Sequence, residues 1–230
     1  MFYDISIKFN HDVIQKSNLI TLHKSVQLIQ KNIIETRQKT IWYSPYNIPL
    51  FVNTVDLSKY GGLIMDTDSY HFNSINILNL IFCGYFGINS YDIRKLTNLK
   101  LLDLTSCNHP YIKSSDIKYL INLTSLNLEN CDQLEMKSSD IKHLINLKSL
   151  NICGCYQPEM KLEDICKLVN LTSLKMSYIR NSYDMNQLIN LNSLIIYDCK
   201  IKSSDICELI NLKTLDLMGC KQHEMKSDDM

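Results

Sequence analysis

Residues 116–131 read DIKYLINLTSLNLENC, and the stretches on either side repeat their apolar skeleton. Residues 92–107 read DIRKLTNLKLLDLTSC and residues 140–155 read DIKHLINLKSLNICGC, and further copies begin at Asp164, Asp184 and Asp205. A repeat of this length predicts a solenoid, because each copy can bury its apolar face only against its neighbours.

Within one copy, the spacing of the leucines indicates a short strand. Leu102 and Leu104 are two residues apart, so they point to the same side of an extended chain. The opposite side then presents Leu101, Asp103 and Thr105. We expect the leucine side to be buried and the other side to form a surface.

The other half of each copy indicates a short helix. Ile93 and Leu96 are three apart, and residues typical of a helix start, Ser114, Ser115 and Asp116, open the next copy. The copy starts at 92, 116, 140, 164, 184 and 205 give steps of 24, 24, 24, 20 and 21 residues. Because the strand pattern survives in the shorter copies, we expect them to lose residues from the turn or helix.

The pattern L-x-x-L-x-L-x-x-C resembles the leucine-rich repeat family, in its cysteine-containing type. It is matched by Leu123, Leu126, Leu128 and Cys131, by Leu147, Leu150, Ile152 and Cys155, and by Leu212, Leu215, Leu217 and Cys220. The resemblance covers residues 45–230 and about eight units. It implies an α/β solenoid, a leucine-rich-repeat horseshoe with a parallel concave sheet and short convex helices.

Residues 1–44 lack the repeat and form a predicted helical N-terminal cap. Leu22, Val26, Ile29 and Ile33 have helical spacing, which predicts a helix over about 21–38. The segment either covers the first repeat or is a degenerate F-box, which the run VQLIQKNIIETRQKTIW resembles although the typical leucine-proline start is absent. An F-box would imply a substrate-recognition adaptor of a ubiquitin ligase.

One repeat position carries most of the cysteines. It holds Cys83, Cys107, Cys131, Cys155, Cys199 and Cys220, out of nine cysteines in the chain. In the family that position lies inside the stack, so we expect a structural ladder of buried thiols rather than disulfides or a metal site. This usage suits a reducing compartment and predicts a cytoplasmic protein.

The amino-acid usage indicates an AT-rich genome. The chain has no alanine and only three arginines, while Asn, Ile, Lys and Tyr are abundant. In this and in its repeat style it resembles leucine-rich-repeat proteins of giant amoeba-infecting viruses, which would place it in the host cytoplasm.

Charge and motifs argue against several function classes. The 24 basic and 24 acidic residues balance, which favours neither nucleic acid nor an acidic membrane as partner. No phosphate loop, metalloprotease motif or nucleophile elbow occurs. We therefore predict no enzyme activity, no cofactor and no metal, and instead a module that binds a protein partner of unknown identity.

Two clusters on the expected concave face are candidate binding sites, because apolar and aromatic side chains grouped on a surface mark interfaces. The early cluster comprises Ile77, Ile81, Phe82 and Leu101. The late cluster comprises Lys175, Tyr178, Ile195 and Tyr197. The last repeat has an uncovered strand edge, which predicts weak self-association through the C-terminal end.

Overall fold

A computed structural model describes much of the repeat region. The described residues are 41–42, 54–56, 58, 75–81, 90–107, 112–131, 137–155, 161–177, 184–198 and 201–220. The chain divides into two compact units, Met1–Lys39 and Thr40–Met230, and all described residues belong to the second. The expected helix over 21–38 lies outside them, so cap and F-box both stay predictions.

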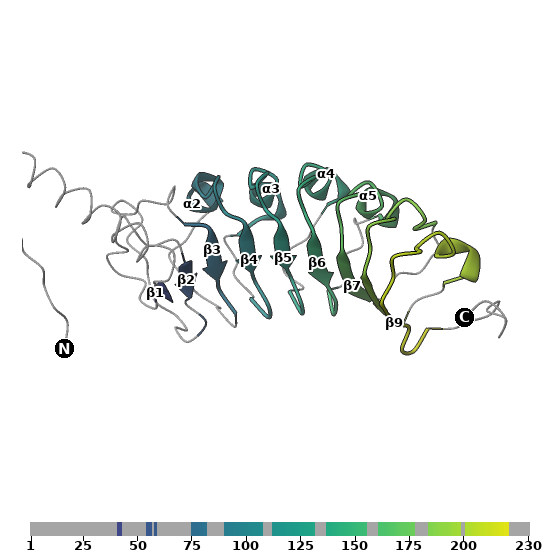
Figure 1. Ribbon diagram of the computed structural model, residues 1–230. Coiled ribbons are helices and arrows are strands. Elements are labelled where there is room, and N and C mark those ends of the chain that lie inside the picture. The colour runs from purple at the N-terminus through teal and green to yellow at the C-terminus, as the bar shows by residue number, and fades with distance from the viewer. Residues whose placement is uncertain are drawn as a thin grey trace, which may run out of the picture. The chain divides into compact units, whose positions relative to one another are not determined.

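A single sheet of nine parallel strands, in chain order, runs through the described residues (Figure 1). The strands are β1 Ile41–Trp42, β2 Thr54–Asp56, β3 Ile77–Asn79, β4 Leu101–Asp103, β5 Ser125–Asn127, β6 Ser149–Ile152, β7 Ser173–Ser177, β8 Ser193–Tyr197 and β9 Thr214–Asp216. Equivalent leucines are register partners, for example Leu102 with Leu126 and Leu126 with Leu150. The expected α/β solenoid with a parallel sheet is thereby confirmed. The sheet begins at β1, a few residues before the predicted boundary at residue 45.

The helices are one turn or little more, and they lie on one side of the sheet (Figure 1). They are α2 Ser90–Lys95, α3 Ser114–Ile117, α4 Ser138–Ile141, α5 Leu162–Ile165 and the 3-10 helix η4 Ser203–Asp205. The repeated aspartate is the third helical residue and folds back on the helix entry. Asp116 Oδ2 accepts the Lys113 backbone N–H at 3.0 Å, and Asp205 Oδ2 accepts that of Lys202 at 2.8 Å.

The two shorter copies keep their strands, as their sequence pattern predicts. Residues 184–192, which lead into β8, contain turns and no helix in this described stretch. The copy that leads into β9 keeps only η4. The strand pattern is the part that cannot be shortened, because it carries the interior leucines.

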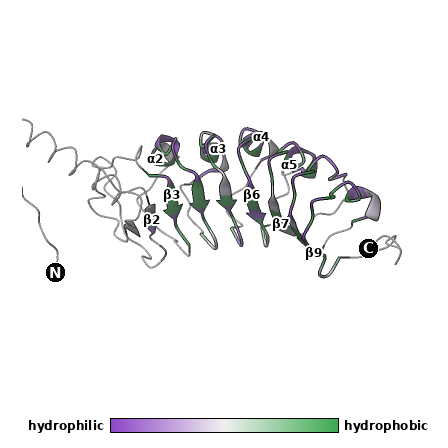
Figure 2. Ribbon diagram, viewed as in Figure 1, coloured by the Kyte–Doolittle hydropathy of each residue, from purple (hydrophilic) through white to green (hydrophobic). Residues whose placement is uncertain are grey.

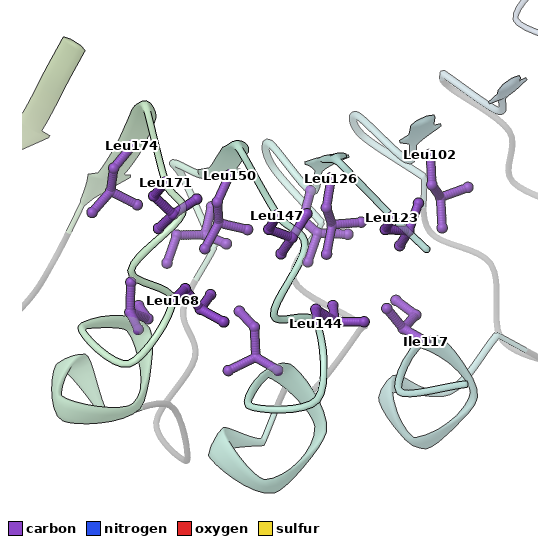
Figure 3. Close-up of a cluster of buried hydrophobic side chains, with 14 of the residues drawn as sticks. Leu102, Ile117, Leu123, Leu126, Leu144, Leu147, Leu150, Leu168, Leu171 and Leu174 are labelled. Atoms are coloured by element: carbon purple, nitrogen blue, oxygen red, sulfur yellow. The ribbon is translucent and has the colours of Figure 1, made fainter. Parts of the chain in front are cut away.

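The hydrophobic core is a row of leucines and isoleucines between the sheet and the helices (Figure 3). Leu123, Leu147 and Leu171 lie two residues before β5, β6 and β7, and none is exposed to solvent. The second residue of each strand from β2 to β8 is also buried, while its neighbours are half-buried. Apolar and polar residues alternate along β5, β6 and β7, whereas β3 begins with two apolar residues and is largely green in Figure 2. Burying one such side chain stabilises the fold by about 1.5–3 kcal/mol.

A row of asparagine amides joins consecutive copies at the turn between helix and strand. Each Nδ2 donates to a backbone carbonyl one copy earlier, at 2.8–2.9 Å. The pairs are Asn122 with Thr97, Asn146 with Ile121, Asn170 with Ile145, Asn190 with Val169 and Asn211 with Ile189. These bonds supply a hydrogen-bond donor to backbone carbonyls that the turn would otherwise leave without one.

Each strand is followed by a tight turn that leads into the cysteine position. The residue before that position has a left-handed backbone in five copies, at Ser106, Asn130, Gly154, Asp198 and Gly219. Asn, Asp and Gly tolerate this conformation best. At Gly154 a Cβ atom would also clash with Asn130 Oδ1. The turn therefore explains the small and polar residues at this position.

Of the cysteines that share one repeat position, the structure describes Cys107, Cys131, Cys155 and Cys220. Cys107, Cys131 and Cys155 are buried, and Cys131 Sγ donates to the Cys107 carbonyl at 3.0 Å. Cys220 is half-buried. The cysteines described are thiols rather than disulfides. Cys83 and Cys199 lie outside the described residues, so the reduced ladder as a whole stays a prediction.

None of the helices in the described ranges is both long enough and apolar enough to cross a membrane.

Candidate functional site

The face of the sheet turned away from the helices carries a column of Asp and Asn residues whose role is structural. Their Oδ1 atoms accept the backbone N–H two residues further on, at 2.9–3.2 Å. The column comprises Asp56, Asn79, Asp103, Asn127, Asn151 and Asp216. Such side-chain turns compete with the strand ladder. They end most of these strands at the column residue itself, as in β4 and β5.

Lys175 and Ile195 depart from this rule. They occupy the same column, as register partners in β7 and β8, but cannot form the side-chain turn. Both strands accordingly run on for two further residues, to Ser177 and Tyr197. Because Asp or Asn is absent from this position in the two copies, the sheet face is longer there. The side chains of Lys175 and Ile195 are not engaged in a strand-ending turn.

Lys175 reaches across a whole copy to a carboxylate. Its Nζ lies 3.2 Å from Glu129 Oε1 and 3.3 Å from Oε2. In the copy between them, Asn151 Nδ2 donates to Glu129 Oε2 at 2.8 Å. The ammonium also lies 5.9 Å from the centroid of the Tyr197 ring. We call Glu129, Asn151, Lys175, Ile195 and Tyr197 the sheet-face patch.

The patch holds a fixed positive charge. Burial lowers the pKa of Lys175, but the hydrogen bond and the negative charge of Glu129 outweigh it, so the pKa lies above its usual value. Lys175 is therefore an ammonium at neutral pH, and it favours the face of Tyr197. All five side chains remain half-exposed. Together they offer a cation, an anion, an aromatic ring and an aliphatic side chain to a partner.

The structure brings together three of the four residues of the predicted late cluster, Lys175, Ile195 and Tyr197; Tyr178 lies outside the described residues. Sequence reasoning did not single out Glu129 or Asn151. A signal was present, since Glu129 is the one charged residue of its column in the sequence and Lys175 the one basic residue of the column beside it.

The early cluster is described in part. Ile77 and Leu101 are register partners on the same face of β3 and β4, and Ile81 follows β3. All three are half-buried. Phe82 lies outside the described residues, so the cluster as predicted is not assembled here.

No group of three or more His, Cys, Asp or Glu side chains within the described ranges is placed to hold a metal ion. Asp116 and Asp205 at the helix starts cap backbone amides.

Comparison with known proteins defines the class of fold. No family model and no curated protein matches the sequence. Among solved structures, internalin C2 of Listeria monocytogenes is similar, with a TM-score of 0.60 and 19% identity, over 76% of this chain and 75% of that one.

Two further structures extend the comparison. A leucine-rich-repeat protein of Leptospira interrogans has a TM-score of 0.53 and 19% identity, over 76% of this chain and 45% of its own. The leucine-rich-repeat ectodomain of a plant membrane receptor kinase from Arabidopsis thaliana, solved in complex with Casparian strip integrity factor 2, has a TM-score of 0.54 and 16% identity, over 76% and 23%.

At these identities the likeness concerns the fold alone. The chain adopts the leucine-rich-repeat solenoid that the sequence pattern resembles.

Proposed function

We propose that this chain is a non-catalytic protein-interaction module whose partner binds the sheet-face patch. The resemblance to leucine-rich repeats makes this the concave face. The observation that carries the proposal is the departure at Lys175 and Ile195, where two copies give up the strand-ending turn and present a cation and an aliphatic side chain instead.

The composition of the patch supports this role. Tyr197 is an aromatic residue at the end of a strand, and tyrosine is enriched among the residues that dominate binding energy. Its ring already packs near the Lys175 ammonium, so a partner would meet an ordered pair. Glu129 and Asn151 fix the position of the lysine, which lowers the entropic cost of binding.

The experiment begins with capture of partners from an extract of amoebal cells, the host that the sequence resemblance implies. The full chain is immobilised, and the captured proteins are identified by mass spectrometry. The affinity of a purified partner is then measured for the wild type and for Tyr197→Ala. We expect a loss of about 2 kcal/mol or more. Tyr119→Ala is the matched control, since Tyr119 is exposed on the helix side. Equal affinity of wild type and Tyr197→Ala contradicts the proposal, and a loss on Ile77→Ala or Leu101→Ala moves the site to the early cluster.

We further propose weak self-association through the end of the sheet at β9. Leu215 occupies the position that is buried in β2–β8, yet it is 45% exposed, and Met218 is 66% exposed. Leu212, Leu217 and Cys220 are only half-buried. Within the described residues β9 pairs with β8 alone, and a strand with an open edge favours addition of another strand.

A further inference from the structure

In each of five copies, one exposed aliphatic side chain lies in the turn between helix and strand, and together these side chains form a row. The members are Ile121, Ile145, Val169, Ile189 and Ile210, which are 47–85% exposed. We call this row the aliphatic stripe. The asparagine that follows each member donates to the previous copy, so the backbone of the row is held in place. Adjacent parallel strands are about 5 Å apart, so the stripe extends over roughly 20 Å.

The equivalent segments of six copies are basic on balance. They are residues 94–100, 118–124, 142–148, 166–172, 186–192 and 207–213, and they contain eight Lys or Arg residues and one acidic residue, Glu208. The first segment has no stripe member and holds three of the eight, so the five segments that carry the stripe contain five lysines and Glu208. The 18 basic and 21 acidic residues of 45–230 thus divide into eight and one on these segments, and ten and twenty elsewhere. The neutral balance of the whole chain hides this separation of charge.

Some of this charge is already compensated. Arg94 Nε pairs with Asp116 Oδ1 at 2.7 Å, and Lys167 Nζ pairs with Asp164 Oδ1 at 2.8 Å. The lysines nearest to the stripe in sequence include Lys142 and Lys148, which precede and follow Ile145 by three residues. Both are exposed, as are Lys100 and Lys213 in the equivalent places of other copies. Ile145, in the middle of the stripe, therefore has a lysine on both sides along the chain, and Ile121 and Ile210 each have one at the same spacing on one side.

We propose that this edge of the solenoid binds the surface of an anionic lipid bilayer. The aliphatic side chains would enter the boundary between headgroups and acyl chains, and the lysines would contact anionic headgroups. Apolar residues beside lysines are the composition that such surfaces attract. A protein partner fits less well, because protein interfaces are depleted in lysine and rely on Trp, Tyr and Arg. The row is also preformed, so no folding has to accompany binding.

The test is sedimentation of the full chain with vesicles of phosphatidylcholine containing about 30% phosphatidylserine, beside vesicles of phosphatidylcholine alone. We expect binding to the anionic vesicles that weakens between about 0.1 M and about 0.5 M salt. The pair Ile145→Ser/Ile189→Ser should weaken it at least about tenfold. The pair Lys142→Glu/Lys148→Glu should weaken it at least about twentyfold.

Matched variants keep the test specific. Lys113→Glu/Lys137→Glu changes the net charge equally at exposed lysines of the helix entries, and it should bind as the wild type does. Met218→Ser removes an exposed apolar side chain elsewhere and should also have no effect. Tyr197→Ala should leave vesicle binding unchanged, which separates this proposal from the sheet-face patch. Far-UV circular dichroism verifies that each variant is folded.

Three results overturn the proposal. One is absence of binding to the anionic vesicles at low salt. The second is equal weakening by the two lysine pairs, which would assign binding to net charge. The third is failure on vesicles together with capture of an acidic protein that Ile145→Ser/Ile189→Ser abolishes, which would assign the stripe to a protein partner.

Discussion

Leu150 and Leu215 occupy the same position of the repeat in very different surroundings, so they form a natural pair for a stability test. Leu150 in β6 is 1% exposed and Leu215 in β9 is 45% exposed. Leu150→Ala leaves a cavity enclosed by copies on both sides, which costs about 3–5 kcal/mol. Leu215→Ala removes a side chain that is about half in water and encloses no cavity, so we expect about 1 kcal/mol.

The expected difference of about 2–4 kcal/mol is measurable by urea unfolding followed by circular dichroism, where it shifts the midpoint by about 1–2 M. Repeat proteins can unfold in parts. Hydrogen exchange of the amides in β6 and β9 therefore gives a second, local comparison. Equal costs for the two substitutions would refute the reasoning, since they would mean that Leu215 is as well covered in solution as Leu150.

Burial, together with nearby negative charges, raises the pKa of Cys166 to about 12, so iodoacetamide should alkylate the exposed Cys207 well before Cys166 in the native chain. Because the unfolded thiol ionises near its ordinary pKa of 9.0 and the buried one does not, the free energy of unfolding should fall as pH rises from about 9 to about 12. Asn146→Ala removes the bond from Nδ2 to the Ile121 carbonyl and should cost about 0.5–1.5 kcal/mol in urea unfolding, whereas no loss would show that water replaces the amide fully. Light scattering over a concentration series should show mass increasing with concentration, and Leu215→Glu should suppress the increase; a constant monomer mass would contradict self-association through β9.

Much of the fold was predictable because the apolar skeleton is local. The two-residue step between Leu102 and Leu104 places both on the buried side. The same spacing of apolar residues within each copy sets the register of neighbouring strands, as with Leu126 and Leu150. The strands of the two shorter copies also followed from the sequence, since their leucine pattern is intact.

The role of the Asp and Asn column could not be read so directly. A polar residue beside a buried leucine fits a solvated surface, and the bond from Asp103 Oδ1 to the Thr105 N–H became visible only with backbone geometry. The pair of Lys175 with Glu129 joins residues 46 positions apart. It depends on how far a lysine side chain extends across the sheet, which no spacing rule encodes.

The basic edge was hidden for a different reason. The 24 basic and 24 acidic residues of the chain cancel in any total. The isoleucine or valine before each asparagine of the row also follows a buried leucine directly, so the sequence does not distinguish an exposed aliphatic residue from a core residue at this place. Only the exposure of residues such as Ile145 in the structure makes this distinction.

The asparagine row has a consequence for how such a gene can change. Each amide bonds to the copy before it in the same way, as Asn146 does with Ile121 and Asn170 with Ile145. Duplication or loss of a whole copy would therefore create a junction whose bonds are already satisfied, and the protein could lengthen or shorten in single steps during evolution. The bridge from Lys175 to Glu129 behaves differently because it passes over one complete copy. An insertion or deletion there would change the distance that the lysine has to span, so the number of copies is free to drift everywhere except beneath that ion pair.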